Sequence, residues 1–238
     1  MSKHELLNNQ DHKALTINLD MSNEMGNNTM HALAFPFEFK ELQAHYPIFF
    51  RKEASSDNYS AVALLGFEKG ENLFIKNNNW QVSYIPAVIE RDPFLIGYQQ
   101  TEESGALIKK PVIHIDMSSP RVNKGEGQPV FLPHGGNSEY LNSVSDVLND
   151  IEGNSKSTKV FFDMLKQYAL LEPFNLDIEL NDGNLNRLSG YYTINQENLY
   201  ALDSEIVGEL NRSGFLMLIY MTIASLANIS KLVSLKNA

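Results

Sequence analysis

The clearest candidate for chemistry is the triplet His114-Ile115-Asp116. On a β-strand, residues two apart point to the same face, so the imidazole of His114 and the carboxylate of Asp116 would lie side by side. One His and one carboxylate supply two of the three ligands that non-haem iron enzymes use, and a second His supplies the third. His134 follows a loop rich in Gly and Pro and is the available third ligand. One hypothesis is therefore an Fe(II) site at His114, Asp116 and His134.

The same triplet has a simpler interpretation that needs no metal. A His at the end of a strand can be followed by an Asp that caps the turn Ser118-Ser119-Pro120. Because the match covers only three residues, this structural role is the more economical explanation of the pattern. We therefore expect no cofactor, with Fe(II) as the alternative.

Two arginines are candidates for binding an anionic ligand. Arg91 lies in the charged stretch Glu90-Arg91-Asp92 between apolar segments, and Arg121 follows the turn after Asp116. A guanidinium pairs with a carboxylate through two parallel hydrogen bonds, so either residue could hold the carboxylate of a ligand or substrate. A salt bridge from Arg91 to a neighbouring side chain is the alternative interpretation.

The composition excludes several other chemistries. The chain has 238 residues and no cysteine, so disulfides, thiol nucleophiles and cysteine-ligated metal centres are ruled out. The formal net charge of −10 argues against general binding to nucleic acid, because an acidic surface repels phosphate backbones. The sequence contains neither a G-x-S-x-G motif nor a phosphate-binding glycine motif. These exclusions do not decide whether the chain is an enzyme.

Both ends of the chain bear on its location. Residues 1–20 lack an apolar core of the length that a signal peptide requires, so we expect a cytoplasmic protein. Residues 215–227 form an apolar run of thirteen residues, fewer than the roughly twenty that span a bilayer. The sequence therefore predicts a helix that is buried in the core, and no transmembrane span.

The apolar pattern predicts the elements that must position these residues. Strands are expected at residues 48–50, 61–67, 73–75, 80–84, 94–98, 112–115, 174–180 and 185–194, with turns at 55–58 and 181–184. Helices are expected at residues 35–45, 141–151, 157–171, 205–211 and 215–233. The predicted fold class is α+β, with a largely antiparallel sheet from the N-terminal half and a C-terminal hairpin. Helices mostly from the C-terminal half would pack on this sheet, in a single domain over residues 1–238.

Segments throughout the chain resemble the bacterial SapC family. In the first half these are LQAHYPI at 42–48, ALLGF at 63–67, ENLF at 71–74, RDPFLIG at 91–97, HID at 114–116 and SPR at 119–121. In the second half they are LEPF at 171–174, GYYTI at 190–194 and IYM at 219–221. The family is distinct from the peptide-transport permease of the same name. The resemblance implies a surface-layer-related protein, and it brings no established catalytic residue.

Two hypotheses for function follow. The resemblance and the lack of a strong catalytic motif favour a non-enzymatic accessory or binding protein of a bacterial surface-layer or outer-membrane uptake pathway. Its partner would be a protein, a peptide or a small molecule. The alternative is a metal-dependent enzyme, similar to non-haem iron oxygenases, that acts on an amino acid or peptide. In that case His114, Asp116 and His134 would bind the metal, and Arg91 or Arg121 would bind the substrate carboxylate.

Overall fold

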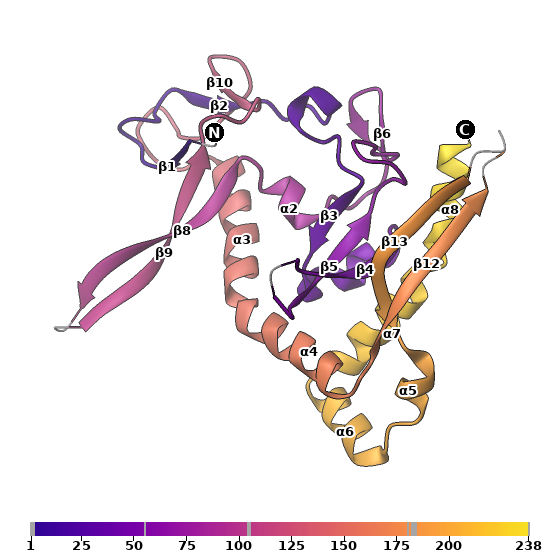
Figure 1. Cartoon of the computed structure of the whole chain (residues 1–238). Helices are drawn as coiled ribbons and strands as arrows, with labels where there is room; N and C mark the ends of the chain where they lie inside the picture. The colour runs from indigo at the N-terminus through magenta and orange to yellow at the C-terminus, as the bar shows by residue number, and fades with distance from the viewer. Residues whose placement is uncertain (1–2, 55, 104–105, 180, 182–184, 238) are drawn as a thin grey trace. The chain divides into compact units, whose positions relative to one another are not determined.

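The computed structural model describes residues 3–54, 56–103, 106–179, 181 and 185–237 (Figure 1). The chain divides into two compact units. The first unit comprises Met1–Asn27, Asn77–Asn79 and Val88–Gly153, and the second comprises Asn28–Lys76, Trp80–Ala87 and Asn154–Ala238. Antiparallel sheets and helices are present in both units, so the predicted α+β class is confirmed. The single domain over residues 1–238 stays a prediction.

The first unit is built on a long β-hairpin. Its main sheet has the strand order β1-β9-β8, with bounds β1 (His4–Leu6), β8 (Phe94–Glu103) and β9 (Ala106–Asp116). A smaller sheet has the order β10-β2-β11, with bounds β2 (Leu15–Ile17), β10 (Val122–Lys124) and β11 (Gln128–Pro129). The predicted strands at 94–98 and 112–115 are confirmed, and both extend well beyond those ranges.

Helix α3 (Glu139–Gly153) provides the apolar partner for this unit. The hydroxyl of Ser138 accepts a hydrogen bond from the backbone N–H of Leu141 at 3.1 Å, so Ser138 is the N-terminal cap. The core combines residues from strands, loop and helix: Leu15, Ile17, Phe94, Ile115, Val130, Phe131, Leu141, Val144 and Leu148. A short 3-10 helix, η1 (Asn23–Met25), follows β2 in this unit.

The second unit contains a five-stranded antiparallel sheet in the order β12-β13-β4-β5-β3. Its strands are β3 (His31–Ala34), β4 (Ile48–Lys52), β5 (Tyr59–Leu64), β12 (Leu171–Glu179) and β13 (Leu185–Ile194). The predicted pairing of segments 48–50 and 61–67 is confirmed, and so is the hairpin of β12 with β13. Ser55 of one predicted turn, and residues 182–184 of the other, lie outside the described residues. Strand β3 was not predicted, and it forms one edge of the sheet.

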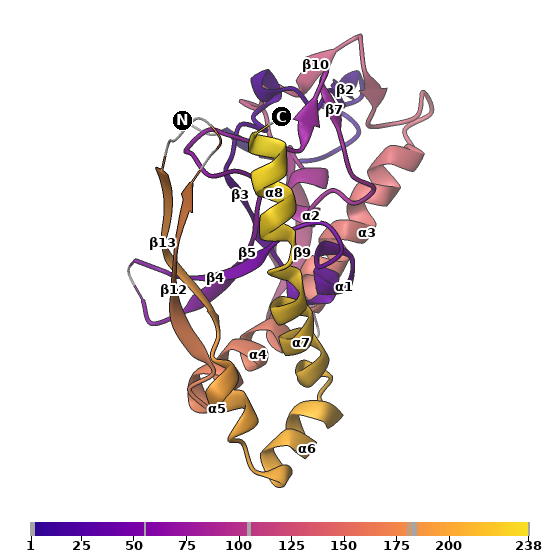
Figure 2. The ribbon, with the colours of Figure 1, turned by 90° about the vertical axis from the view of Figure 1, so that its right-hand side faces the viewer.

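Aromatic side chains join the helices of the second unit to one face of this sheet. Phe50 of β4 packs against Phe161 and Phe162, with ring centroids 6.5 and 5.8 Å apart. Phe161 also meets Phe39 and Phe215, so three helices cover the same face (Figure 2). These helices are α1 (Phe39–Leu42), α4 (Ser155–Gln167) and α7 (Phe215–Ser225), and the remaining ones are η2 (Pro36–Glu38), α5 (Gln196–Tyr200), α6 (Ser204–Arg212) and α8 (Asn228–Lys236). The side chains of Asn195 and Asp203 cap the N-termini of α5 and α6.

The strand predicted at residues 80–84 is wrong beyond Trp80. Strands β6 (Ile75–Lys76) and β7 (Asn79–Trp80) form a minimal hairpin, and Asn77 and Asn78 turn the chain with positive φ values of 51° and 60°. After Trp80 the backbone bends instead of continuing as a strand, up to the short helix α2 (Ala87–Glu90). The alternation of side chains there reflects hydrogen bonds to other parts of the fold rather than a pleated strand.

The apolar C-terminal helix is only partly buried, which corrects the prediction of a buried core helix. Helices α7 and α8 follow one another and together cover Phe215–Lys236. Among the described residues this is the one helical stretch that is long and apolar enough, by length and composition, to cross a membrane. Only 22% of its most apolar 18-residue window is buried, and Met217 is 57% exposed. The absence of a transmembrane span stays a prediction.

Candidate functional site

His114 and Asp116 lie on the same strand, β9, and each side chain already has a structural role. The imidazole of His114 lies over Gly97 of β8, so closely that a methyl group at Gly97 would come within 2.3 Å of His114 Cδ2. The Oδ1 of Asp116 accepts hydrogen bonds from the backbone N–H of Lys3 at 3.1 Å, and from the N–H and hydroxyl of Ser118 at 2.9 and 2.6 Å. The hydroxyl of Ser118 is the main cause that lowers the pKa of Asp116. Asp116 therefore caps the turn that follows its strand.

The metal-binding hypothesis lacks a third ligand in the part of the chain that the structure describes. No group of three His, Cys, Asp or Glu side chains there is arranged to hold a metal ion. His134 is exposed in the loop between β11 and α3. The imidazole near the carboxylate of Asp116 is that of His4, whose Nε2 is 3.7 Å from Asp116 Oδ2. The set of His114, Asp116 and His134 stays a prediction.

The two predicted arginines do come together, at Asp92 in the first unit. Arg121 is 2% exposed, and its Nε lies 3.1 Å from Asp92 Oδ2. The Nε–H does not point at the carboxylate, so this contact is an ion pair rather than a hydrogen bond. The Nη2 of Arg121 donates to Asn27 Oδ1 at 2.9 Å. Burial raises the pKa of Asp92, while Arg121 and Arg91 oppose that effect.

Arg91 is oriented by the backbone. Its Nη1 donates a hydrogen bond to the carbonyl oxygen of Phe94, and burial lowers the pKa of its guanidinium. The hydroxyl of Tyr140 is buried without a hydrogen-bond partner in the described structure, and burial raises its pKa to about 12. Burial also raises the pKa of Glu90. The charges of this polar centre are thus largely balanced within the chain, which suits a structural role.

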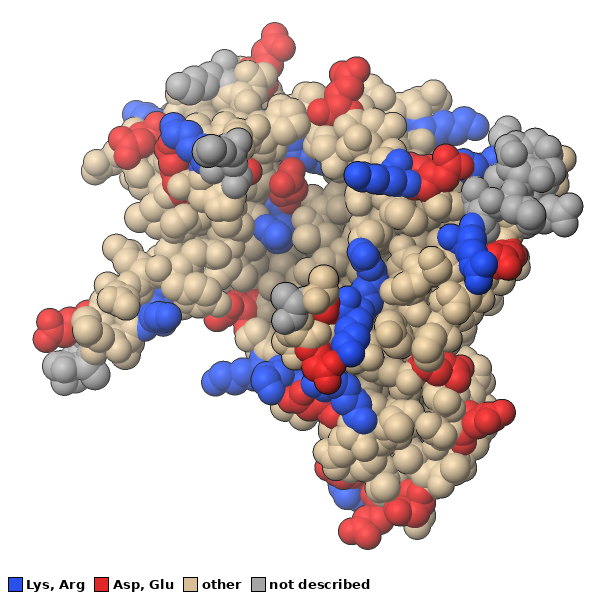
Figure 3. All heavy atoms as spheres, viewed as in Figure 1, with Lys and Arg blue, Asp and Glu red and all other residues tan. Residues whose placement is uncertain are grey.

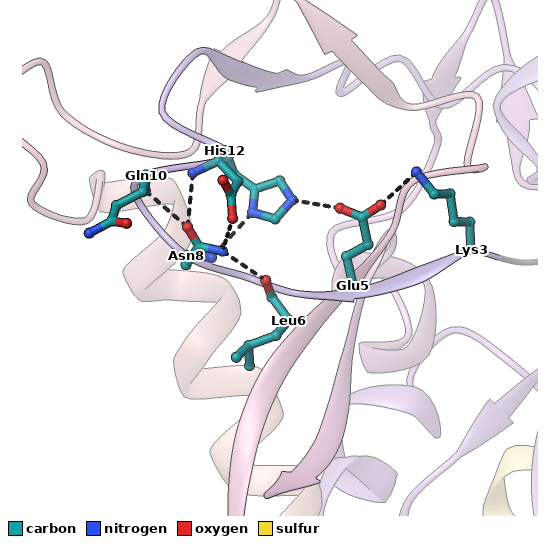
Figure 4. Close-up of polar contacts among 7 residues, drawn as sticks. Lys3, Glu5, Leu6, Asn8, Gln10 and His12 are labelled. Atoms are coloured by element: carbon teal, nitrogen blue, oxygen red, sulfur yellow. Dashed lines mark hydrogen bonds and ion pairs between the residues drawn. The ribbon is translucent and has the colours of Figure 1, made fainter.

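A second polar cluster, which sequence reasoning missed, surrounds His12 (Figure 4). His12 is 3% exposed, and its Nδ1 accepts the backbone N–H of Asn8 at 3.2 Å. The ring proton is therefore on Nε2, which faces Glu5 Oε2 at 3.3 Å, and Glu5 Oε1 pairs with Lys3 Nζ at 2.7 Å. Lys3, Glu5 and His12 line a hollow of about 290 Å³. Both ring nitrogens are engaged, so His12 holds the N-terminal segment in place. No sequence signal marks it, because one partner is a backbone amide.

The second unit has its own buried polar centre at Glu38. Its Oε2 accepts hydrogen bonds from the hydroxyl of Tyr84 and the backbone N–H of Ala87, both at 2.9 Å. Its Oε1 accepts the N–H of Phe35 at 2.9 Å. Tyr46 donates to the carbonyl oxygen of Tyr84, and burial raises the pKa of its phenol. This network replaces the predicted strand at 80–84 and is structural.

The surface of the second unit carries two hollows whose exposed lining is mostly apolar, although polar and charged residues contribute to both. One has a volume of about 280 Å³ and is lined by residues that include Phe37, Met217 and Met221. The other has a volume of about 350 Å³ and is lined by residues that include Phe35 and Phe162. The rings of Phe35 and Phe37 stack with centroids 5.8 Å apart and planes 11° from parallel. Each hollow therefore has one ring of the stacked pair in its wall, and both share Thr158 of α4.

A third, more polar hollow of about 450 Å³ lies in the same unit and contains Arg51. The Nη1 of Arg51 is 2.7 Å from His31 Nε2, and its guanidinium carbon is 5.8 Å from the ring centroid of Tyr191. Arg51 was not among the residues that the sequence singled out. Its partners are 20 and 140 positions away, so no local pattern marks it.

These features define an α+β protein of two compact units. A family model for SapC matches residues 7–232, nearly the whole chain. The chain belongs to the SapC family. Comparison with curated proteins finds no match, and comparison with solved structures finds none either.

Proposed function

We propose that this chain is a non-enzymatic accessory protein that binds a peptide, protein segment or small ligand in a bacterial surface-layer or outer-membrane uptake pathway. The chain belongs to the SapC family, and the surface-layer relation that this family implies supports the proposed pathway. The observation that carries the binding role is the pair of hollows around the stacked rings of Phe35 and Phe37.

The size and lining of these hollows support ligand binding. Binding sites are concave and mostly apolar, with volumes from about 300 Å³ upward. The hollows of about 280 and 350 Å³ each fit one or two apolar side chains of a ligand. Met217 and Met221 line the first hollow, and flexible thioether side chains adapt to ligands of different shape. Met217 is 57% exposed, which leaves apolar surface available to a partner.

The binding role is tested with the full chain and a pool of random hexapeptides as the probe. Methyl NMR signals of Met217 and Met221 should shift in a saturable manner as the pool is added, whereas that of Met25, in the first unit, should stay in place. The variant F37A should weaken the response about tenfold, because it removes one wall of the hollow. V160A is the matched control, since Val160 is an exposed residue of α4 that lines neither hollow. Absence of any shift at millimolar peptide would contradict the proposal.

We also propose that the protein is cytoplasmic, with the exposed face of α7 available to a partner rather than inserted in lipid. Cell fractionation followed by an alkaline wash of the membranes tests this location. The protein should be in the soluble fraction. Retention in the washed membrane pellet would contradict the proposal and would assign the stretch Phe215–Lys236 to the bilayer.

A further inference from the structure

Strand β3 provides an unpaired edge beside two adjoining hollows of the second unit. It is the last strand of the sheet, and β5 is its neighbour. His31, Leu33 and Phe35 alternate along this extended segment, so their side chains point to one side. His31 lines the polar hollow, Phe35 lines the apolar hollow of about 350 Å³, and Leu33 lines both. The two hollows therefore follow the direction of the edge strand.

Helix α4 forms the opposite wall of the apolar part. Thr158, Lys159 and Phe162 of this helix line the same hollow as Leu33 and Phe35. A free strand edge that faces a helix across a hollow suits an extended peptide. Such a peptide adds as a further strand through main-chain hydrogen bonds, and its alternate side chains enter the hollow.

Arg51, at the polar end, has no carboxylate within ion-pair distance among the described residues, although Glu53 also lines this hollow. Among the ion pairs of the described residues, Arg51 has no Asp or Glu partner, whereas the adjacent Lys52 pairs with Asp57 at 2.6 Å. A guanidinium has no acceptor, so His31 Nε2 accepts the hydrogen bond from Arg51 and the imidazole is neutral. The side chain is held in position from one side by His31 and from the other by the face of Tyr191.

The charged side chains around the two hollows carry a small excess of positive charge. Arg51 and Lys52 line the polar hollow, and Lys159 and Lys166 line the apolar one, while the carboxylates there are Glu53, Asp163 and Asp57, the partner of Lys52. Asp163 pairs with both lysines of α4. Figure 3 shows Lys and Arg side chains near the end of the β4–β5 hairpin and α4, with acidic side chains among them. In a chain with a net charge of −10, this local excess of positive charge is complementary to an anionic group on a partner.

We propose that the edge of β3 binds an extended apolar peptide segment whose carboxylate pairs with Arg51. This inference rests on the proposed binding function and specifies its ligand. The main chain of the peptide pairs with β3, its apolar side chains enter the hollow at Phe35 and Phe162, and its carboxylate receives two parallel hydrogen bonds from the guanidinium. The carboxylate comes from the C-terminus of the segment or from an Asp or Glu side chain.

Three pools of random hexapeptides test the proposal. The first pool lacks Asp and Glu and has a free C-terminal carboxylate, the second is the same pool with an amidated C-terminus, and the third is amidated and contains one Glu. Each pool is mixed with the full chain, and the retained peptide is quantified by ultrafiltration and mass spectrometry. The wild type should retain the first or the third pool about tenfold more than the second, and which of them is retained identifies the source of the carboxylate. Amide hydrogen exchange at residues 31–34 should slow when peptide binds.

The variant R51Q should lower retention of the carboxylate pools to the level of the amidated pool. R187Q is the matched control, because Arg187 is an exposed arginine of the same unit with an Asp177 partner at 3.5 Å, and it should behave as the wild type. Circular dichroism confirms that both variants fold. Equal retention of all pools by the wild type, or a preference that persists in R51Q, would overturn the carboxylate site but leave the binding function. Retention of no pool would overturn both.

Discussion

Two arginines, one in each unit, use the same side chain in opposite ways. Arg121 is 2% exposed, donates a hydrogen bond to Asn27 and forms an ion pair with the carboxylate of Asp92, both in its own chain. Arg51 lies in an open hollow, where a neutral His31 holds it and no carboxylate balances it among the described residues. The first guanidinium stabilises the fold, whereas the second keeps its charge for a group from outside.

This comparison shows that the residue type does not separate a structural arginine from a binding one. Arg51 lies between Phe50 and Lys52, and Arg121 lies between Pro120 and Val122, and neither stands in a recognised binding motif. What separates them is burial and the presence of an internal carboxylate, and both depend on tertiary structure. The predictions below test this assignment of roles, from the largest expected effect to the smallest.

The largest effect is expected from R121M in the first unit. Methionine is similar in length but cannot balance Asp92, and it removes the hydrogen bond from Arg121 Nη2 to Asn27 Oδ1. Breaking a fully buried ion pair from one side costs about 3–5 kcal/mol, and because the side chain of Asp92 is 47% exposed to water, we expect the free energy of unfolding to fall by about 2–4 kcal/mol. Urea denaturation at neutral pH measures it.

R187Q, which alters an exposed pair, is the control and should change stability by about 0.5 kcal/mol or less. A loss below about 1 kcal/mol in R121M would break the comparison. In that case Arg121 would not be needed for stability and would again be a candidate for binding an anionic ligand.

E38Q should have the next largest effect on stability. It tests whether the second unit has a structural polar centre at Glu38, separate from the proposed binding residue Arg51. The carboxylate of Glu38 accepts hydrogen bonds from Phe35, Tyr84 and Ala87. An amide in its place has a single oxygen, so its NH2 group must face at least one of these donors. We expect a loss of about 2–3 kcal/mol by urea denaturation. Y84F removes a single donor and should cost about 1 kcal/mol. Equal losses in the two variants would mean that the charge of Glu38 is unimportant.

Much of the fold was predictable because its signals are local. The pairs β4–β5, β8–β9 and β12–β13 each join neighbouring apolar segments through a turn, and the pattern of alternation marks them. The edge strand β3 was missed, since its sequence HALA is short and small and becomes a strand by pairing with β5. The strand predicted at 80–84 failed because buried Glu38 and Tyr46 bind that segment.

The functional residues were less predictable for the same physical reason. Arg91 and Arg121 were predicted to bind an anionic group because they are arginines, and the structure places both near Asp92. Arg51 and His12 were missed, because their roles arise from a ring nitrogen 20 residues away and from a backbone amide. Neither partner leaves a motif in the sequence.

G97A should have a moderate effect and tests whether His114 is a packing residue rather than a free ligand. Alanine normally improves a strand position that glycine occupies. Here its Cβ would lie 2.3 Å from His114 Cδ2, so the imidazole must move, and we expect a loss of about 1–2 kcal/mol by urea denaturation. Adding H114A should recover most of this loss. If the costs of G97A and H114A were simply additive, His114 would not be fixed by this contact.

The smallest effect concerns the pH dependence that His31 gives to the second unit. Burial, and then the charge of Arg51, lower the pKa of His31 below its ordinary value of 6.5. As the pH falls through 6.5, the unfolded chain therefore binds a proton at this residue before the folded chain does. Stability should decline from that point until the lowered pKa of folded His31 is reached.

The variant H31N removes this contribution, so its urea midpoint should fall less than that of the wild type between pH 7 and pH 5. H134N, in an exposed loop of the first unit, should keep the slope of the wild type. An unchanged slope in H31N would mean that His31 does not have to stay neutral beside Arg51. The guanidinium would then lack the fixed orientation on which carboxylate binding at β3 depends, because a neutral Nε2 is the acceptor that holds it.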